Sequence, residues 1–552
     1  MKNKYQLITL GVLGVIFFFI YSYLSLTTPL IFNSPDETAN YFFAELYAEE
    51  GRLWESEPLE FAAGNSIFPR SIKALGGRLV PVGFLGLPLT YGLIAKVIGT
   101  WSILFLTPLF AVFAVLAFYG IIRKIFSNNV AFLSSILMFA LPPFWYYATR
   151  GLFHNLLFVS FLIIAIYFLQ KAYSNTDVYE KVRSLNAPSG LIGLLGSFKF
   201  LHKFSFYALG GLFLGLTLTT RLSEFWWIMI ICAIMFFLGY GDPHLRRFES
   251  RRYGIVIIIA FFILTFTPFL YQNQILYDSP FATGYQTQIS DSASVISTDS
   301  VPIVNNASAS LVLPFGFHPK TIVWSAYNYY LMFFPWLVIP AFLGILIFLF
   351  EKKMSYNKSL YFLIFCLITG WLLIYYGSWK FHDNIDPSKI TIGTSYLRYW
   401  LPSFIMLLPF LSKFILFLSG LWKKKVWKYG LPIALVALFF YFSFFSVFYS
   451  EDEGIFQVKQ TLAGYDLRSQ EVLELTEEDA IIITDRSDKL FFPERRIIYP
   501  LRSARTYNLI PKLIDFVPIY YYGISLSEEE DIEIEMQEMK RWGNESLYEI
   551  VH

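Results

Sequence analysis

Residues 6–41 read QLITLGVLGVIFFFIYSYLSLTTPLIFNSPDETANY, an apolar run followed at once by a polar segment. The apolar part, 6–27, has about the length of a membrane span. Two lysines precede it and it contains no small-x-small cleavage signal, so we expect an uncleaved first span rather than a signal peptide. The polar part carries two adjacent acids, Asp36 and Glu37, which this order places at a membrane surface.

The composition excludes a soluble protein. The chain has 552 residues, of which 56% are hydrophobic, 20% aromatic and only 15% charged, and its mean hydropathy is +0.51. Soluble domains usually carry about 25% charged residues. The net charge of +2 gives no basic field for nucleic acid. The two cysteines, Cys232 and Cys366, lie inside apolar runs and are interpreted as buried hydrophobes. We therefore predict an all-α polytopic membrane protein.

Eleven apolar runs are long enough to cross a bilayer. They lie near 6–27, 100–122, 129–147, 152–170, 204–222, 225–240, 253–272, 323–350, 357–376, 395–418 and 428–449. A weaker run, 82–98, is interrupted by Pro88, Gly92 and Lys96, and we expect it to be interfacial or re-entrant. With the eleven runs as spans, the basic connections all fall on one side, as the positive-inside rule requires.

The opposite, extracytoplasmic side then receives 28–81, 148–151, 273–322, 377–394 and everything after 450. We predict a transmembrane domain over 1–450 and a soluble extracytoplasmic domain over 451–552, called the tail below. The loop 273–322 contains a stretch poor in bulky residues and is predicted to be mobile.

Short apolar runs in the tail predict strands at Ala480–Thr484, Arg496–Pro500 and Val517–Gly523. Polar or helical stretches such as Glu528–Trp542 separate them. This alternation predicts a small α/β domain. Asp485 is interpreted as a turn residue, and we assign the tail no chemistry.

The acidic pair opens a helix by several rules at once. Ser34 is a good N-cap, Pro35 suits the first helical position, and Glu37 stands three residues after Ser34 as in a capping box. Gly51 predicts the end of this helix after Glu50.

Glu37 has a capping role available, whereas Asp36 is expected to project beside the membrane. The plain alternative is that both acids merely favour the positive end of the helix. A carboxylate at this place can accept a proton from an alcohol or bind a metal. Asn40, one turn further along, is placed to steady Asp36.

An extracytoplasmic Asp-Glu pair after the first span resembles the signature of membrane glycosyltransferases of the GT-C fold, which include the protein O-mannosyltransferases and the aminoarabinose transferase of lipid A. Later segments are similar to segments of that superfamily in type and order. They are Leu141–Tyr147 with Arg150 and His154-Asn155, Gly211–Arg221, Asn273–Tyr285 (NQILYDSPFATGY) and Ser395–Pro402 (SYLRYWLP).

The resemblance implies a GT-C domain of about 11 to 13 spans followed by the soluble tail. It also implies a polyprenyl-phosphate-linked sugar donor and inverting transfer, at the extracytoplasmic face, to a hydroxyl of a protein, lipid or glycan acceptor. Asp36 would match the catalytic base, with Glu37 as its structural or secondary partner. We expect an integral protein of the plasma membrane or an equivalent membrane.

The leaving phosphate needs positive charge nearby. Arg398 lies four residues into an otherwise apolar span and is the first candidate to bind the donor phosphate. Arg150 is second, and Arg70 and Arg78 close the first loop. The plain alternative for each of these arginines is that its side chain only extends its charged group to the membrane–water interface. Arg221 has an acid, Glu224, at i+3, so a plain ion pair is the better interpretation there.

Further substrate-binding candidates are extracytoplasmic polar groups, namely His154, Asn155, Tyr285, Lys380, His382 and Asp383. No metal or nucleotide motif is present in the sequence. No cofactor is therefore firmly predicted, and a divalent cation such as Mg²⁺ or Mn²⁺ at Asp36 is left open, although the mannosyltransferase and aminoarabinose branches work without one.

Two other classes remain as alternatives. A transporter or flippase of lipid-linked saccharides would show charged or broken helices near mid-membrane and often repeated halves. A cell-surface polysaccharide polymerase or ligase would depend on arginines and large outer loops rather than on an early acidic pair. The gathering of polar groups at one face favours the glycosyltransferase.

Overall fold

The computed structural model describes residues 2–174, 189–238, 248–285, 313–381, 389–526 and 534–551. Its chain divides into two compact units. Unit 1 comprises Met1–Tyr23, Thr107–Pro268 and Thr298–Ile455, and unit 2 comprises Leu24–Leu106, Phe269–Ser297 and Phe456–His552.

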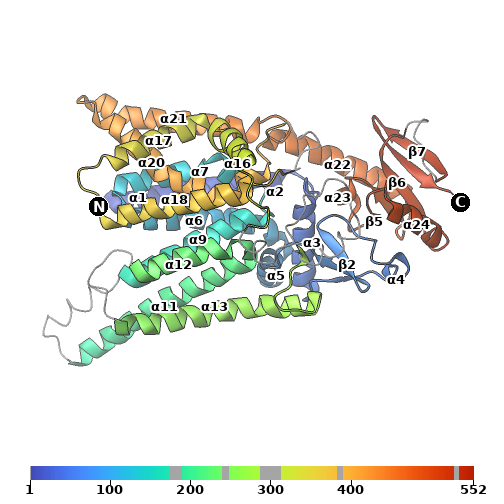
Figure 1. Ribbon diagram of the computed structural model, residues 1–552, viewed down its shortest axis with the longest axis horizontal. Coiled ribbons are helices and arrows are strands. Elements are labelled where there is room, and N and C mark those ends of the chain that lie inside the picture. Colours follow the sequence, from blue (N-terminus) through green and yellow to red (C-terminus); the bar gives the residue numbers. More distant parts are fainter. Residues whose placement is uncertain are drawn as a thin grey trace. The chain divides into compact units, whose positions relative to one another are not determined.

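Unit 1 is a bundle of helices that run roughly side by side (Figure 1). Its elements are α1 (Lys2–Tyr21), α6 (Ile103–Ile125), α7 (Asn128–Phe139), α8 (Pro142–Thr149), α9 (His154–Ser174), α11 (Ser189–Thr220), η2 (Leu222–Glu224), α12 (Phe225–Leu238), α13 (Phe248–Tyr277), α16 (Pro319–Ser325), η4 (Ala326–Met332), α17 (Pro335–Leu349), α18 (Tyr356–Gly377), α19 (Ser395–Tyr399), α20 (Leu401–Gly420) and α21 (Lys425–Phe448). The first turn of α6, before Thr107, and the end of α13, after Pro268, are assigned to unit 2.

Seven described helices are long and apolar enough to cross a membrane, or ten if each of three bent pairs is one span. The pairs bend by 47° between α7 and α8, by 111° between α11 and α12, and by 97° between η4 and α17. Each of the eleven predicted runs coincides with one of these helices or with a member of a bent pair. The predicted polytopic membrane domain is therefore confirmed.

Prolines cause two of the three bends. Pro142 and Pro335 stand at the first position of α8 and α17, where a missing N–H costs no helical hydrogen bond. The residues before them are pushed out of the helical region, and Leu141 accordingly has an extended backbone with ψ of 120°. At the third bend, Arg221 is extended, with φ of −149°.

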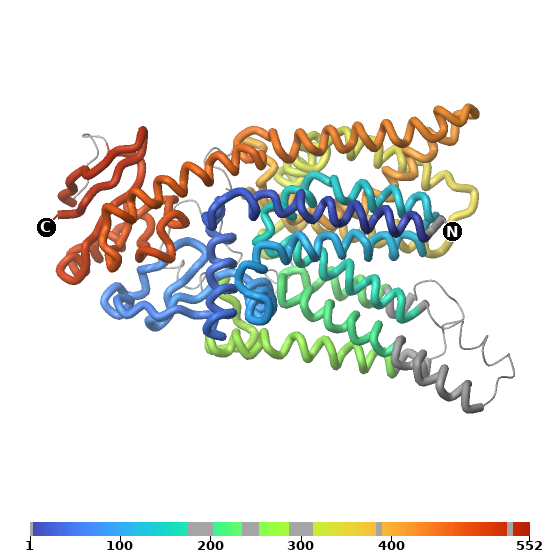
Figure 2. Tube along the Cα trace, turned by 180° about the vertical axis from the view of Figure 1, so that it is seen from behind, coloured from blue at the N-terminus to red at the C-terminus, as the bar shows by residue number. Residues whose placement is uncertain are grey.

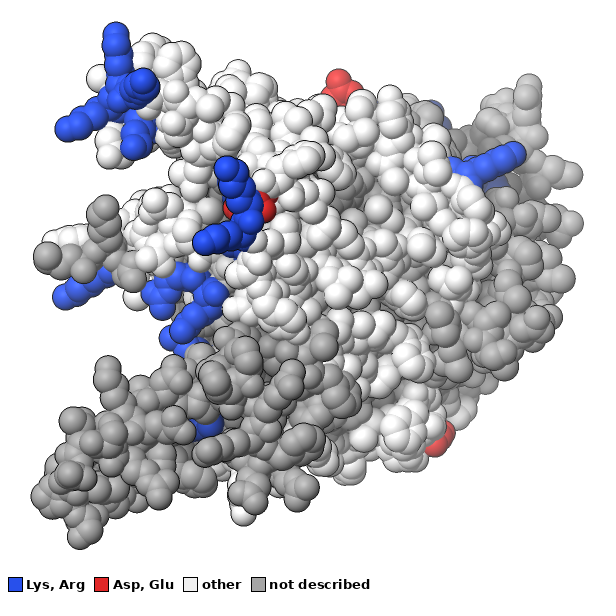
Figure 3. Space-filling model, turned by 60° about the vertical axis from the view of Figure 1, so that its left-hand side comes forward, with Lys and Arg blue, Asp and Glu red and all other residues white. Residues whose placement is uncertain are grey.

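The basic connections gather at one end of unit 1. The α17–α18 and α20–α21 connections lie at the same end of the bundle as the N-terminus (Figure 1). Figure 3 shows lysines and arginines mainly along one edge of a broad surface that carries few other charges. This arrangement agrees with the charge distribution that the positive-inside rule predicts from the sequence.

Unit 2 combines the first loop with the tail. Its elements are α2 (Tyr23–Thr27), α3 (Pro35–Glu50), β1 (Glu55–Ser56), α4 (Glu60–Ala63), β2 (Ile72–Leu75), β3 (Arg78–Pro81), α5 (Gly86–Ile98), η1 (Thr100–Ser102), α22 (Ile455–Leu475), β4 (Ile481–Thr484), α23 (Asp488–Phe491), β5 (Arg496–Ile498), α24 (Ala504–Leu513), β6 (Ile519–Ile524), β7 (Met536–Trp542) and β8 (Glu545–Ile550).

A three-stranded antiparallel sheet has the order β1-β3-β2, and a five-stranded mixed sheet has the order β5-β4-β6-β8-β7. In the second sheet β4 pairs in parallel with β5 and β6, whereas β8 pairs antiparallel with β6 and β7. The three strands predicted in the tail correspond to β4, β5 and β6, so the predicted α/β tail is confirmed.

The stretch 528–542, expected to be polar or helical, is neither coil nor helix in its described part, because Met536–Trp542 forms the edge strand β7. Its residues pair antiparallel with β8, with Met536 opposite Ile550. A hairpin partner supplies the hydrogen bonds that override the helix propensity of the Glu-rich sequence. The residues 527–533 lie outside the described part of the chain.

The first loop and the tail lie side by side within unit 2 (Figure 2) and share one hydrophobic core. Ala63 and Ile67 pack in the same buried cluster as Ile481, Ile483 and Tyr521. The tail therefore folds together with the loop that carries the acidic pair, although α21 ends close to the predicted boundary at 450.

The 82–98 run contains the 13-residue helix α5, whose length of about 20 Å is shorter than the roughly 30 Å of a hydrocarbon core. This length fits the predicted interfacial placement.

Within the predicted mobile loop 273–322, residues 286–312 lie outside the described part of the chain.

Candidate active site

Helix α3 begins and ends as its sequence predicts. The Ser34 hydroxyl accepts a hydrogen bond from the Asp36 amide at 3.3 Å, and Pro35 occupies the first position. Gly51 ends the helix in the left-handed region, with φ of 75°, and its N–H donates to the Tyr47 carbonyl. This cap geometry fixes the acidic pair in the first turn, where the helix dipole favours negative charge.

The two acids of this turn have different surroundings. Glu37 is only 4% exposed and Asn40 is also buried, whereas Asp36 is half-buried. The Ser71 hydroxyl donates to Asp36 Oδ1 at 2.6 Å. Asp36 is thus the acid with a face toward solvent, and Glu37 is packed inside unit 2.

Arg70, next to Ser71, binds the tail. Its Nε and Nη2 donate to Asp488 Oδ1 at 2.9 and 2.5 Å, and its backbone N donates to Oδ2 at 2.8 Å. The Asp488 side chain is 1% exposed. Arg78 places its guanidinium 4.4 Å from the centroid of the Trp54 ring. Phosphate binding by Arg70 and Arg78 stays a prediction.

In unit 1, three arginines lie around two aromatic rings. Arg150 and Arg398 hold their guanidinium carbons 5.0 and 4.8 Å from the centroid of the Phe153 ring. Arg398 and Arg221 lie 5.3 and 4.7 Å from the centroid of the Tyr399 ring. We call these five residues the arginine cluster. The structure therefore brings together Arg398 and Arg150, the two arginines that the sequence ranks first.

Hydrogen bonds hold the elements that carry the arginine cluster. Tyr147, three residues before Arg150, donates to the carbonyls of Gly393 and Thr394, both at 3.0 Å, and so ties α8 to the start of α19. Arg150 Nη1 donates to the Tyr146 hydroxyl at 2.9 Å. Arg398 Nη2 donates to Ser395 Oγ at 2.7 Å.

Arg221 forms the predicted ion pair with Glu224, with 3.0 Å between Nη2 and Oε1. Arg221 also donates to the Tyr376 hydroxyl, and the Trp227 indole donates to Glu224 Oε2 at 2.6 Å. Tyr376 in turn stacks on Tyr399, with 4.3 Å between ring centroids. The ion pair is therefore built into the arginine cluster, which the i,i+3 spacing alone does not reveal.

Two of the three arginines are removed from water, since Arg150 is 5% and Arg221 8% exposed, and Arg398 is half-buried. Burying cationic groups is costly, and such groups in membrane segments usually serve binding or transport. Guanidinium groups match the geometry of phosphate oxygens in bidentate fashion. The arrangement is suited to holding a phosphate.

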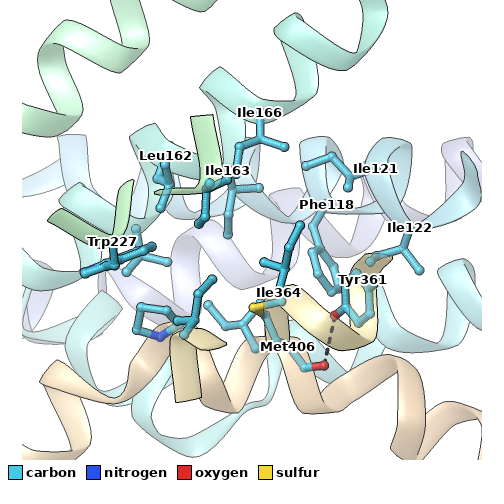
Figure 4. A pocket seen from close by; sticks show the side chains of 15 residues that line it. Phe118, Ile121, Ile122, Leu162, Ile163, Ile166, Trp227, Tyr361, Ile364 and Met406 are labelled. Carbon is cyan, nitrogen blue, oxygen red and sulfur yellow. Dashed lines mark hydrogen bonds between the residues drawn. The ribbon is translucent and has the colours of Figure 1, made fainter. Parts of the chain in front are cut away.

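An apolar pocket of about 100 Å³ lies between α6, α9, α12, α18 and α20 (Figure 4). Isoleucines such as Ile163 and Ile364 line it, and the Tyr361 hydroxyl turns to the Met406 carbonyl at 2.9 Å. Trp227 links the pocket to the arginine cluster indirectly. Its ring lines the pocket, and its N–H donates to Glu224, the ion-pair partner of Arg221.

The remaining candidates are spread over the chain. His154 and Asn155 are buried at the start of α9. Tyr285 is 42% exposed and stands 5.2 Å from the Phe84 ring, between centroids, in unit 2. Lys380 is exposed. His382 and Asp383 lie outside the described residues.

One carboxyl of unit 2 that the sequence does not single out is strongly perturbed. Glu60 is 1% exposed, and its Oε1 accepts from the Ile67 amide at 2.6 Å. Burial raises the pKa of Glu60 to about 7, against the opposing effect of backbone hydrogen bonds from Ile67 and Ser66. Glu60 is therefore largely protonated below neutral pH.

The bundle of apolar helices, with its bent pairs, has the architecture that the resemblance to the GT-C fold implies. A family model described as dolichyl-phosphate-mannose-protein mannosyltransferase matches residues 81–180. No curated protein is similar enough in sequence to count as a match.

Solved structures match over nearly the whole chain. ArnT from Cupriavidus metallidurans, in the apo state, is 9% identical, with 100% of this chain and 98% of that chain covered and a TM-score of 0.52. The oligosaccharyltransferase AglB from Archaeoglobus fulgidus, in complex with an inhibitory peptide and a dolichol-phosphate, is 12% identical over 94% of this chain and 69% of its own, with a TM-score of 0.51. These matches confirm the GT-C resemblance and the fold class.

Proposed function

We propose that this protein is a membrane glycosyltransferase. It transfers a sugar from a polyprenyl-phosphate-linked donor to an acceptor hydroxyl, with inversion, at the extracytoplasmic face. The GT-C fold and the family match over 81–180 support glycosyl transfer. The observation that carries the mechanism is the half-buried Asp36 carboxylate, held by Ser71 in the first turn after the first span.

Asp36 acts as the general base. Its carboxylate takes the proton of the acceptor hydroxyl while that oxygen forms a bond to the anomeric carbon. The bond between this carbon and the donor phosphate breaks, and its electron pair leaves with the phosphate. Attack from the face opposite the phosphate inverts the configuration. Glu37, buried beside Asp36, has a structural role.

Arg398 and Arg150 hold the donor phosphate and stabilise the charge that grows on it as it leaves. Their guanidinium groups face the same Phe153 ring, so both can reach one phosphate group. Arg221 is engaged by Glu224 and keeps the Tyr399 side of the arginine cluster in place.

The prenyl chain lies in the apolar pocket. The Trp227 ring lines the pocket and its N–H donates to Glu224, the ion-pair partner of Arg221, so a lipid whose phosphate is held by the arginines can extend its prenyl chain toward the pocket. Burial of each methylene from water contributes about 0.8 kcal/mol.

The connectivity supports an extracytoplasmic site. Helix α20 leads toward Lys423–Lys425 at the basic end of unit 1, and Arg398 precedes the other end of α20. Arg150 likewise follows α8, at the far side of the α7–α8 pair from Arg123 and Lys124. Basic ends face the cytoplasm, so the arginine cluster faces outward.

No cation takes part in the proposed steps. Among the described residues, no group of three or more His, Cys, Asp and Glu side chains could hold a metal ion. A divalent cation at Asp36 stays an open expectation, because Mg²⁺ is usually held by one or two carboxylates together with substrate phosphates.

The test is sugar transfer from a purified polyprenyl-phosphate donor to a hydroxyl acceptor by the Asp36→Asn variant. We expect a loss of about 100- to 10,000-fold in kcat, because the amide cannot accept the proton. Glu49→Gln, at an exposed position of the same helix, is the matched control and should transfer normally. Normal transfer by Asp36→Asn would overturn the mechanism, and lipid movement without transfer would favour a flippase.

A further inference from the structure

Ser71 has an unusual backbone. It is not a glycine, yet its φ is +63°, in the left-handed region that side chains disfavour. Such a conformation persists only where the surroundings enforce it, and it is often associated with function. In this molecule it occurs at the residue whose hydroxyl donates to Asp36 at 2.6 Å.

The tail enforces this conformation through one buried carboxylate. Asp488 accepts from the backbone N of Arg70 and from its guanidinium, so the residue before Ser71 is fixed at both its main chain and its side chain. The Ser71 carbonyl accepts from the Val82 amide at 3.1 Å, which fixes the other side.

The same short segment of the tail also contacts the helix that carries Asp36. Lys489 Nζ donates to the Asn33 carbonyl at 2.6 Å, just before the N-cap of α3. Phe492 packs edge-on against Phe42 of α3, with 4.8 Å between ring centroids. The donor and the acceptor of the Ser71–Asp36 hydrogen bond are therefore both anchored on residues 488–492.

We propose that the tail positions the base. Asp488 holds Arg70, Arg70 sets the backbone of Ser71, and the Ser71 hydroxyl fixes the rotamer of the Asp36 carboxylate toward the acceptor. Ser71, Arg70 and Asp488 are positioning residues, and their role rests on the proposed function of Asp36. A base held in one rotamer spends more of its time in reach of the acceptor proton, which acts on kcat rather than on donor binding.

Three substitutions at Ser71 separate its hydroxyl from its backbone. Ser71→Gly relaxes the left-handed conformation but removes the donor, so it should fold at least as well as wild type while kcat falls about 10- to 100-fold. Ser71→Ala should lose a similar factor. Ser71→Asn tolerates the left-handed region and offers an amide donor, so it should recover part of the lost kcat. The donor KM should stay unchanged in all three.

Asp488→Asn tests the link to the tail. It should lower kcat as Ser71→Gly does, and the double variant should be no slower than the slower single variant, because both act through one path. Arg505→Gln is the matched control. Arg505 also ties the tail to the first loop, through Ser66 and the Gly64 and Asn65 carbonyls, but away from Asp36.

Wild-type kcat in Ser71→Gly, or an equal loss in Arg505→Gln, would overturn the positioning role while leaving Asp36 as the base. An active Asp36→Asn variant would instead refute the proposed function itself. The positioning role and the proposed function are thus tested by different variants of the full-length protein in the same transfer assay.

Discussion

The acidic pair of unit 2 and the arginine cluster of unit 1 are held in place by different physical means. Asp36 stands in a solvated turn, where a cap and a hydroxyl fix it through hydrogen bonds. Arg150 and Arg398 stand among aromatic rings on helices far apart in the sequence. The first arrangement follows from local sequence rules, and the second arises only when distant helices pack.

The arginine cluster offers the largest effect after loss of the base. Arg398→Ala should raise the donor KM about 10- to 100-fold, because a charge-assisted contact to the phosphate is lost. Steady-state transfer at varied donor concentration measures this. Lys358→Gln is the matched control, because Lys358 of α18 is a basic residue of unit 1 that pairs with Glu351 and lies outside the arginine cluster. An unchanged donor KM in folded Arg398→Ala would remove this residue from the site.

The apolar pocket should distinguish donors by chain length. Ile163→Trp fills the pocket, so we expect the KM for a long-chain polyprenyl donor to rise about 10-fold while a donor with only two isoprene units is little affected. Competition between the two donors in one assay measures the ratio. Equal effects on both chain lengths would place the prenyl chain elsewhere.

Glu60 should make unit 2 less stable as the pH rises. Its pKa is about 7 in the folded state against an ordinary value of 4.5, so the unfolded chain ionises first and stability falls between about pH 4.5 and 7, then levels off. Glu60→Gln should remove this slope and gain about 1–3 kcal/mol at pH 8. Thermal unfolding of the solubilised wild-type and Glu60→Gln proteins at pH 5 and pH 8 measures this difference. The same change in stability with pH in both proteins would show that Glu60 does not cause it.

The smallest effect is expected at the end of α3. Gly51→Ala places a Cβ in the left-handed region and should cost about 1 kcal/mol of stability. Transfer activity should stay unchanged, since the cap lies four turns from Asp36. A drop in Tm of a few degrees would agree with this, and a loss of kcat at full stability would show that the far end of the helix also guides the acid.

The sequence predicts what depends on neighbouring residues. The bounds of α3, the strands β4 to β6 and the apolar runs all follow from caps, alternation and length. Arg70 was predicted near the site but its partner was not, because Asp488 lies 418 residues away and its Asp-Arg-Ser-Asp context is typical of a turn. β7 was missed for another reason: its partner β8 follows it directly in the chain, but its mostly exposed, polar residues lack the alternation of a half-buried strand.

The pairing of Arg70 with Asp488 also determines when unit 2 can finish folding during synthesis. These residues are separated by 418 positions, so the first loop leaves the ribosome long before its partner. At about 5–20 residues per second, the loop waits roughly 20–80 s without the strands that cover Ala63 and Ile67. Under the proposed function, a nascent chain that is still being inserted therefore has Asp36 without the contacts of residues 488–492, and it becomes active only after this segment has been translated.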